Sequence, residues 1–184
     1  EADYPGIERM IFTLGLAISG LIQMLFAYRM WFEYRKILPS KLLTLALCCG
    51  IFTGANLFVM SFADMYDHFV LHVITASMVF QVGMVWAVVS HFAIPNANPL
   101  GKRIRRLSIL VSVVSYIIMN NAVVRAINDL EEYGLDDDTI FTLDRIQDAI
   151  DVAAYAEYAL FVGLILCLYS FEQDFIAVSK SIEE

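Results

Sequence analysis

Residues 69–94 read FVLHVITASMVFQVGMVWAVVSHFAI and contain no Asp, Glu, Lys or Arg. About 20 helical residues cross the hydrocarbon core of a bilayer, which is about 30 Å thick. A backbone inside that core finds no water, so its hydrogen bonds have to be satisfied within the segment, as in a helix. The stretch lacks the apolar–polar alternation of a membrane β-barrel strand. It therefore predicts a transmembrane helix.

Further stretches of this kind set the fold class. They are free of charge apart from Glu157 and cover residues 10–28, 42–63, 107–124 and 152–171. We predict an all-α integral membrane protein, with one antiparallel transmembrane helix bundle as a single domain over residues 1–184. The spans are expected at about residues 9–31, 42–63, 68–93, 105–124 and 152–172. With 59% hydrophobic residues, the chain has apolar surface for one bundle and little left for a second domain.

Basic residues fall on alternate connections, which predicts the orientation of the bundle. They are Arg29, Arg35, Lys36 and Lys41 after the first span, and Lys102, Arg103, Arg105 and Arg106 after the third. Basic segments beside a span stay in the cytoplasm. The connection at Asp64 and Asp67 and an acidic outer-face segment over residues 125–150 are expected on the other side. The N-terminus is then outside and Lys180 inside. A further span before Glu1 would bring both ends to the cytoplasm.

The second basic cluster has two compatible interpretations. It is a topology signal, and it is also placed to bind anionic lipid headgroups, with about 1 kcal/mol for each charge near the membrane surface. We predict headgroup contact for Lys102, Arg103, Arg105 and Arg106. The net charge of −8 argues against nucleic acid as a partner.

Local signals define parts of the second span. Pro39 and Ser40 end the first basic connection, and Ser40 is a suitable N-cap for the helix that follows. Small and polar bundle residues allow close helix approach in a membrane, and we assign this role to Gly50, Gly54, Ala55, Asn56 and Gly83.

Polar side chains at membrane depth are costly and usually have a role. We expect the neutral ones to form hydrogen bonds between helices; they are Gln23, Asn56, Gln81, Asn120 and Asn121. An ionisable cluster is predicted near the outer surface and consists of Asp64, His68, His72, Arg125 and Glu157. Glu157 is expected to pair with His72 or Arg125 and so to fix the packing of the last helix.

The row of Asp64, His68 and His72 has successive i+4 spacings and could bind a metal ion or relay a proton. A catalytic zinc site usually has three protein ligands, and this row reaches three only if all its members converge. No phosphate-binding loop, nucleophile elbow or Cys-x-x-Cys pair is present in the sequence. We therefore assign no catalytic residue, no metal ligand and no cofactor.

Several short motifs resemble those of the Frag/DRAM/Sfk family and cover nearly the whole chain. Residues 4–12 resemble its Pro-Glu-x-x-Phe element, although Gly6 and Ile7 separate the Pro from the Glu. The other elements are His72-x3-Ala76-x3-Phe80, Ala156-Glu157-Tyr158 with Tyr for the usual Trp, and Ser170-Phe171-x2-Asp174-Phe175. The resemblance implies a protein of six spans whose first helix precedes Glu1. It also implies lipid handling in association with other machinery, because members modulate autophagy, remodel the lipid of GPI anchors or regulate phosphoinositide kinase.

Two classes of function compete. The favoured hypothesis is a non-enzymatic membrane subunit that binds lipid and docks or regulates a larger lipid-handling or lipid-transfer protein, because the connections are too short for a soluble catalytic domain. The alternative is an intramembrane hydrolase or acyltransferase that remodels a phospholipid or GPI anchor through Asp64, His68, His72 and Glu157. A channel or transporter ranks below both, since no charged pore-lining series is present. We expect the endoplasmic reticulum or another endomembrane, with the plasma membrane or lysosome as alternatives.

Overall fold

The computed structural model describes residues 6–36, 39–63, 67–94, 98–132, 146–172 and 174–175 of the 184-residue chain. The helices in this part are α1 (Ile7–Tyr34), α2 (Lys41–Met60), α3 (Phe69–Ala93), α4 (Pro99–Glu132) and α5 (Gln147–Tyr169). All five are long and apolar enough to cross a membrane, and the described residues contain no strand. The predicted all-α transmembrane bundle is confirmed.

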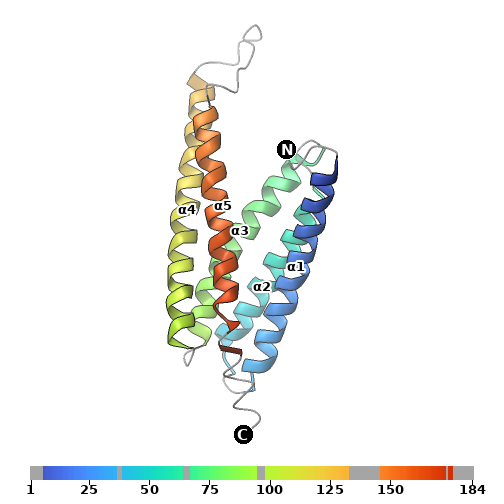
Figure 1. Cartoon of the computed structure of the whole chain (residues 1–184), viewed down its shortest axis with the longest axis vertical. Coiled ribbons are helices and arrows are strands. Elements are labelled where there is room, and N and C mark those ends of the chain that lie inside the picture. Colours follow the sequence, from blue (N-terminus) through green and yellow to red (C-terminus); the bar gives the residue numbers. More distant parts are fainter. Residues whose placement is uncertain are drawn as a thin grey trace.

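The helices form two groups that meet at one end (Figure 1). The α4 and α5 helices lie side by side, and α2 packs between α1 and α3. The α3 helix runs obliquely and also contacts both α4 and α5, although less extensively. The two groups approach each other at the end where α1 finishes and α4 begins, and they diverge toward the end where α1 starts. The α5 helix therefore packs mainly on α4 and contacts the α1–α3 group much less.

Several helices extend beyond the expected spans. The α4 helix covers Pro99–Glu132, so residues 125–132 of the expected outer-face segment continue this helix. The hydropathy of a sequence marks only the part that contacts lipid, whereas a helix can continue into water through its own backbone hydrogen bonds. At the other side of that segment, residues 147–150 begin α5. Residues 133–145 lie outside the described part.

The α1 and α2 helices cross closely because glycines stand at the crossing point. A Cβ on Gly20 would lie 2.6 Å from the carbonyl oxygen of Gly54, and a Cβ on Gly54 would lie 2.6 Å from that of Gly20. A Cβ on Gly50 would lie 2.5 Å from the Cβ of Ala27. The prediction that Gly50 and Gly54 permit close packing is therefore confirmed. So is the N-cap, because the Ser40 Oγ accepts a hydrogen bond from the Leu43 N–H at 3.1 Å.

The orientation of the bundle can be tested by cysteine labelling in sealed vesicles. Arg35 and Arg103 are exposed at the end where the two groups meet, and Arg125, whose side chain is 76% exposed, is near the opposite end of α4. We expect cysteines at positions 35 and 103 to react from the cytoplasmic side and a cysteine at 125 from the other side. The native cysteines that need replacement by alanine are Cys48, Cys49 and Cys167. Labelling of positions 35 and 125 from one side would contradict the orientation.

Candidate functional site: an apolar cavity between the helix groups

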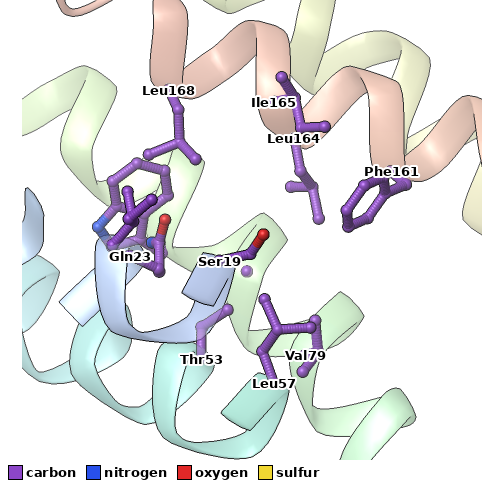
Figure 2. A pocket seen from close by; sticks show the side chains of 12 residues that line it. Ser19, Gln23, Thr53, Leu57, Val79, Phe161, Leu164, Ile165 and Leu168 are labelled. Carbon is purple, nitrogen blue, oxygen red and sulfur yellow. The ribbon is translucent and has the colours of Figure 1, made fainter. Parts of the chain in front are cut away.

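A cavity of about 210 Å³ lies between α5 and the α1–α3 group (Figure 2). Apolar side chains and a glycine form most of its wall: Ile22, Leu57, Val79, Gly83, Trp86, Phe161, Leu164, Ile165 and Leu168. Ile22 of α1 is 56% exposed and Ile165 of α5 is 48% exposed. Since both residues line the cavity and also reach the outer surface of the bundle, the cavity opens sideways between α1 and α5, toward the surrounding lipid.

Gly83 helps to keep this space open. A Cβ at this position would lie 3.4 Å from Leu164 and 3.5 Å from Thr53, which are ordinary van der Waals distances. Gly83 therefore does not mediate a close helix crossing, in contrast to Gly20 and Gly54. A larger side chain at position 83 would extend into the cavity.

Three polar residues interrupt the apolar wall on the side of α1 and α2. Ser19 and Gln23 lie one turn apart on α1, Thr53 lies on α2, and Figure 2 shows their side chains directed toward the cavity. Gln23 and Thr53 are each 6% exposed. The hydroxyl of Thr53 is buried and has no hydrogen-bond partner among the described residues.

The cavity is closed at the end where the helix groups meet by a cluster of aromatic rings. Phe26 of α1 contacts Trp86 of α3, with ring centroids 6.1 Å apart. It also contacts Phe171 and Phe175, which follow α5, at 5.7 and 5.4 Å. The contacts with Trp86, Phe171 and Phe175 are edge-to-face, an arrangement that adds about 0.5–1.5 kcal/mol for each pair. This cluster joins the two helix groups.

A buried ion pair lies next to the aromatic cluster and contacts its Phe171 ring. Arg105 of α4 is fully buried and pairs with Asp174, which is 2% exposed. The Arg105 Nε also donates to the Ser170 Oγ at 3.0 Å, and its guanidinium carbon lies 3.6 Å from the centroid of the Phe171 ring. The backbone N–H of Asn98 donates to the Asp174 carboxylate at 2.6 Å. The start of α4 is thereby fixed to the segment after α5.

The predicted headgroup contact is wrong for Arg105. The side chains of Arg103 and Arg106 are exposed and that of Lys102 is partly exposed, but Arg105 lies on the buried face of α4. That face is a stripe of small residues, which includes Gly101, Ser108 and Ser112 and packs on α5. A Cβ on Gly101 would lie 2.6 Å from the Ser170 carbonyl oxygen, so the chain after α5 packs closely on the face of α4 that also carries Arg105. The spacing of the small residues was a sequence signal for this burial.

The residues of the expected ionisable cluster lie apart. Asp64 is outside the described residues. His68 directly precedes α3, and the Nδ1 of His72 donates to the Ala63 carbonyl oxygen at 2.7 Å, which ties α3 to the end of α2. Arg125 is near Asp129 on its own helix, with 3.9 Å between nitrogen and oxygen. In the part of the chain that the structure describes, no three His, Cys, Asp or Glu side chains are close enough to hold one metal ion.

Glu157 is exposed and has no ion pair or hydrogen bond with another described residue. The expected pairing with Arg125 fails because of the register of α4 and α5. Ser170 lies beside Gly101, and Gly163 lies beside Ser108, so Glu157 is level with about Ser115 of α4. Arg125 is ten residues farther along α4, a distance of about 15 Å along the helix.

Glu157 nevertheless lies on the cavity side of α5. It precedes the cavity residues Phe161, Leu164 and Leu168 by four, seven and eleven residues. Residues at these spacings lie on the same face of a helix. It is also close enough to His72 for the two side chains to interact electrostatically. Glu157 therefore lies outward of the cavity, on the side where the helix groups diverge.

The neutral polar residues at membrane depth differ in their hydrogen-bond partners. Gln81 of α3 donates to the Tyr116 hydroxyl of α4 at 2.8 Å, which confirms the expected bond between helices for this residue. The amides of Asn56 and Asn120 instead donate to carbonyl oxygens one turn earlier on their own helices. Asn121 is exposed, and neither it nor Gln23 has a hydrogen bond to another described residue.

Comparison with known proteins gave one finding. The family model described as the Frag1/DRAM/Sfk1/Cwh43P N-terminal domain matches residues 4–178. Neither a search of curated proteins nor a search of solved structures gave a match. The matched range includes every helix and the whole cavity, and it supports the resemblance seen in the short motifs.

Proposed function

The chain belongs to the Frag1/DRAM/Sfk1/Cwh43P N-terminal domain family and is a multi-pass membrane protein, and on this premise we propose that it is a non-enzymatic membrane subunit that binds lipid. The lipid would enter from the bilayer and place an acyl chain in the cavity between α5 and the α1–α3 group. The chain would then present the bound lipid to a larger lipid-handling protein, or would regulate that protein according to whether lipid is bound. We place this activity in an endomembrane such as the endoplasmic reticulum.

The observation that carries the proposal is the apolar cavity and its sideways opening. Apolar cavities large enough for several atoms remain free of water and bind apolar molecules. The wall here consists of aliphatic and aromatic side chains from four helices, with three polar exceptions. Because Ile22 and Ile165 flank the opening and are exposed, an acyl chain could enter without crossing a polar surface.

Docking of a partner protein is supported by a polar patch on α4. Asn120 and Asn121 are both exposed, although they lie within the uncharged part of the helix. Polar side chains in contact with lipid are costly, and in membrane proteins they usually face another helix. We propose that a transmembrane segment of the partner covers this patch.

Filling the cavity should remove lipid binding. Gly83→Leu adds side-chain atoms that extend into the cavity, whereas Gly15→Leu is a matched control because a Cβ at Gly15 has nothing within 4 Å. We expect the amount of lipid that co-purifies with Gly83→Leu to fall about tenfold, which corresponds to about 1.4 kcal/mol of binding free energy. Gly15→Leu should bind as the native chain does. Lipid extraction from purified protein followed by mass spectrometry gives the measurement.

Two results would contradict the proposal. Equal lipid content in Gly83→Leu and the native chain would show that the cavity is not the binding site. Turnover of a phospholipid or a GPI acyl chain by the purified native chain would favour the intramembrane hydrolase or acyltransferase instead. Thermal unfolding in detergent, recorded for both variants, separates a filled cavity from a misfolded protein.

A further inference from the structure

We infer that the ligand of the cavity is a neutral lipid with a hydroxyl group and that Gln23, assisted by Ser19, binds this hydroxyl. The inference rests on the proposed lipid binding and specifies the class of lipid. It starts from the three polar side chains that interrupt an otherwise apolar wall. They come from two helices and are brought together by the close crossing at Gly20 and Gly54.

Gln23 is a buried residue that lines the cavity, and no described residue supplies its amide with a hydrogen-bond partner. A threonine in a helix commonly donates to the carbonyl oxygen of the preceding turn. Thr75 does so, with 2.7 Å between its Oγ1 and the Leu71 oxygen. The Gln23 amide forms no hydrogen bond with another described residue. The buried hydroxyls of Thr53, Ser90 and Ser112 also lack a partner among the described residues. Ser90 and Ser112 do not line the cavity, and Thr53 faces Gly83 with its methyl group while its hydroxyl has almost no accessible surface.

Unmade hydrogen bonds of buried groups cost free energy, so a ligand that supplies these bonds gains affinity. The Gln23 amide can both donate and accept. The Ser19 hydroxyl donates to the Gly15 oxygen at 2.7 Å, which leaves its own oxygen free to accept. A ligand hydroxyl also donates and accepts, and it matches this set of groups.

The charges around the cavity decide between a neutral and a charged ligand group. None of the residues that line the cavity is Asp, Glu, Lys or Arg. A phosphate or ammonium group in this position would be buried without a counter-ion, which costs far more than one hydroxyl. Ser19 and Gln23 also lie within the uncharged stretch 10–28 of α1, away from both membrane surfaces. The polar group that reaches them is therefore uncharged.

The inference can be tested with two probes of equal chain length, oleyl alcohol and 1-octadecene, both radiolabelled. Their binding to the purified full chain in detergent would be measured by equilibrium dialysis. We expect the native chain to prefer the alcohol about fivefold, which is within the range for one or two net hydrogen bonds. Gln23→Met removes the amide and nearly keeps the volume, so this variant should lose the preference and still bind the hydrocarbon. Thr75→Val, on α3 and already bonded within its helix, should keep the preference.

The outcomes separate this inference from the proposed function. Equal binding of both probes by the native chain would overturn the hydroxyl assignment and leave lipid binding intact, as expected if Gln23 only holds water. An unchanged preference in Gln23→Met would also overturn it. Failure of both probes to bind would overturn the two proposals together. Thermal unfolding without ligand gives a second measurement, since Gln23→Met removes no hydrogen bond between described residues and should unfold no earlier than the native chain.

Discussion

Asp174→Leu is expected to lower the free energy of unfolding by about 3–5 kcal/mol, the usual cost of removing one partner from a buried ion pair. Asp174 is 2% exposed and its carboxylate balances the charge of Arg105, which is fully buried. The Asn98 backbone N–H also loses its acceptor. Because Phe171 and Phe175 flank Asp174 in the sequence and join the two helix groups, we expect unfolding to begin at this end of the bundle.

A double variant tests whether the unpaired charge of Arg105 accounts for the loss of stability. Arg105→Met combined with Asp174→Leu leaves no unpaired charge, so the double variant should be more stable than Asp174→Leu alone. Arg103→Met is the matched control, since Arg103 is exposed on the same turn of α4, and its effect should stay within about 0.5 kcal/mol. Denaturant unfolding in mixed micelles, followed by circular dichroism, measures all three. The explanation fails if the double variant is no more stable than Asp174→Leu.

The sequence predicted the helices well because one strong signal decides them. A stretch without charge such as 69–94 has few alternatives to a transmembrane helix. The ends were less accurate, as α4 shows by continuing to Glu132, because helix ends in water depend on local backbone bonding and not on hydropathy. The arrangement in two groups was not predicted, since it depends on which helix faces pack together.

The candidate site was predicted less well, for reasons of register and depth. Charge alone grouped Arg105 with the exposed Arg103 and Arg106, whereas helix geometry places it against α5. Glu157 was expected beside Arg125 because both belong to the outer half of the chain's spans, but the contact of Gly163 with Ser108 shows a different register. Gln23 was expected to form a bond between helices. Its position in a cavity could be seen only once α5 had been placed opposite α1.

Gly54→Val is expected to separate α1 from α2 and to lower the free energy of unfolding by about 3 kcal/mol, at the upper end of the usual cost of overpacking. A Cβ on Gly54 would lie 2.6 Å from the Gly20 carbonyl oxygen and 3.1 Å from the Met24 backbone nitrogen. Both are backbone atoms, which cannot move without moving the helix. Gly15→Val, with no atom within 4 Å of its Cβ, should cost much less and serves as the control.

The same substitution should also impair the cavity, because Ser19 precedes Gly20 and Thr53 precedes Gly54 in the chain. A shift of the crossing moves both side chains away from α5, so Gly54→Val should lose lipid binding even under conditions where it remains folded. Lipid content measured at a temperature well below the unfolding midpoint tests this. Gly54→Val protein that is less stable yet retains its full lipid content would show that the crossing supports only the fold. Loss of lipid from folded protein would show that this crossing also positions the polar side of the cavity.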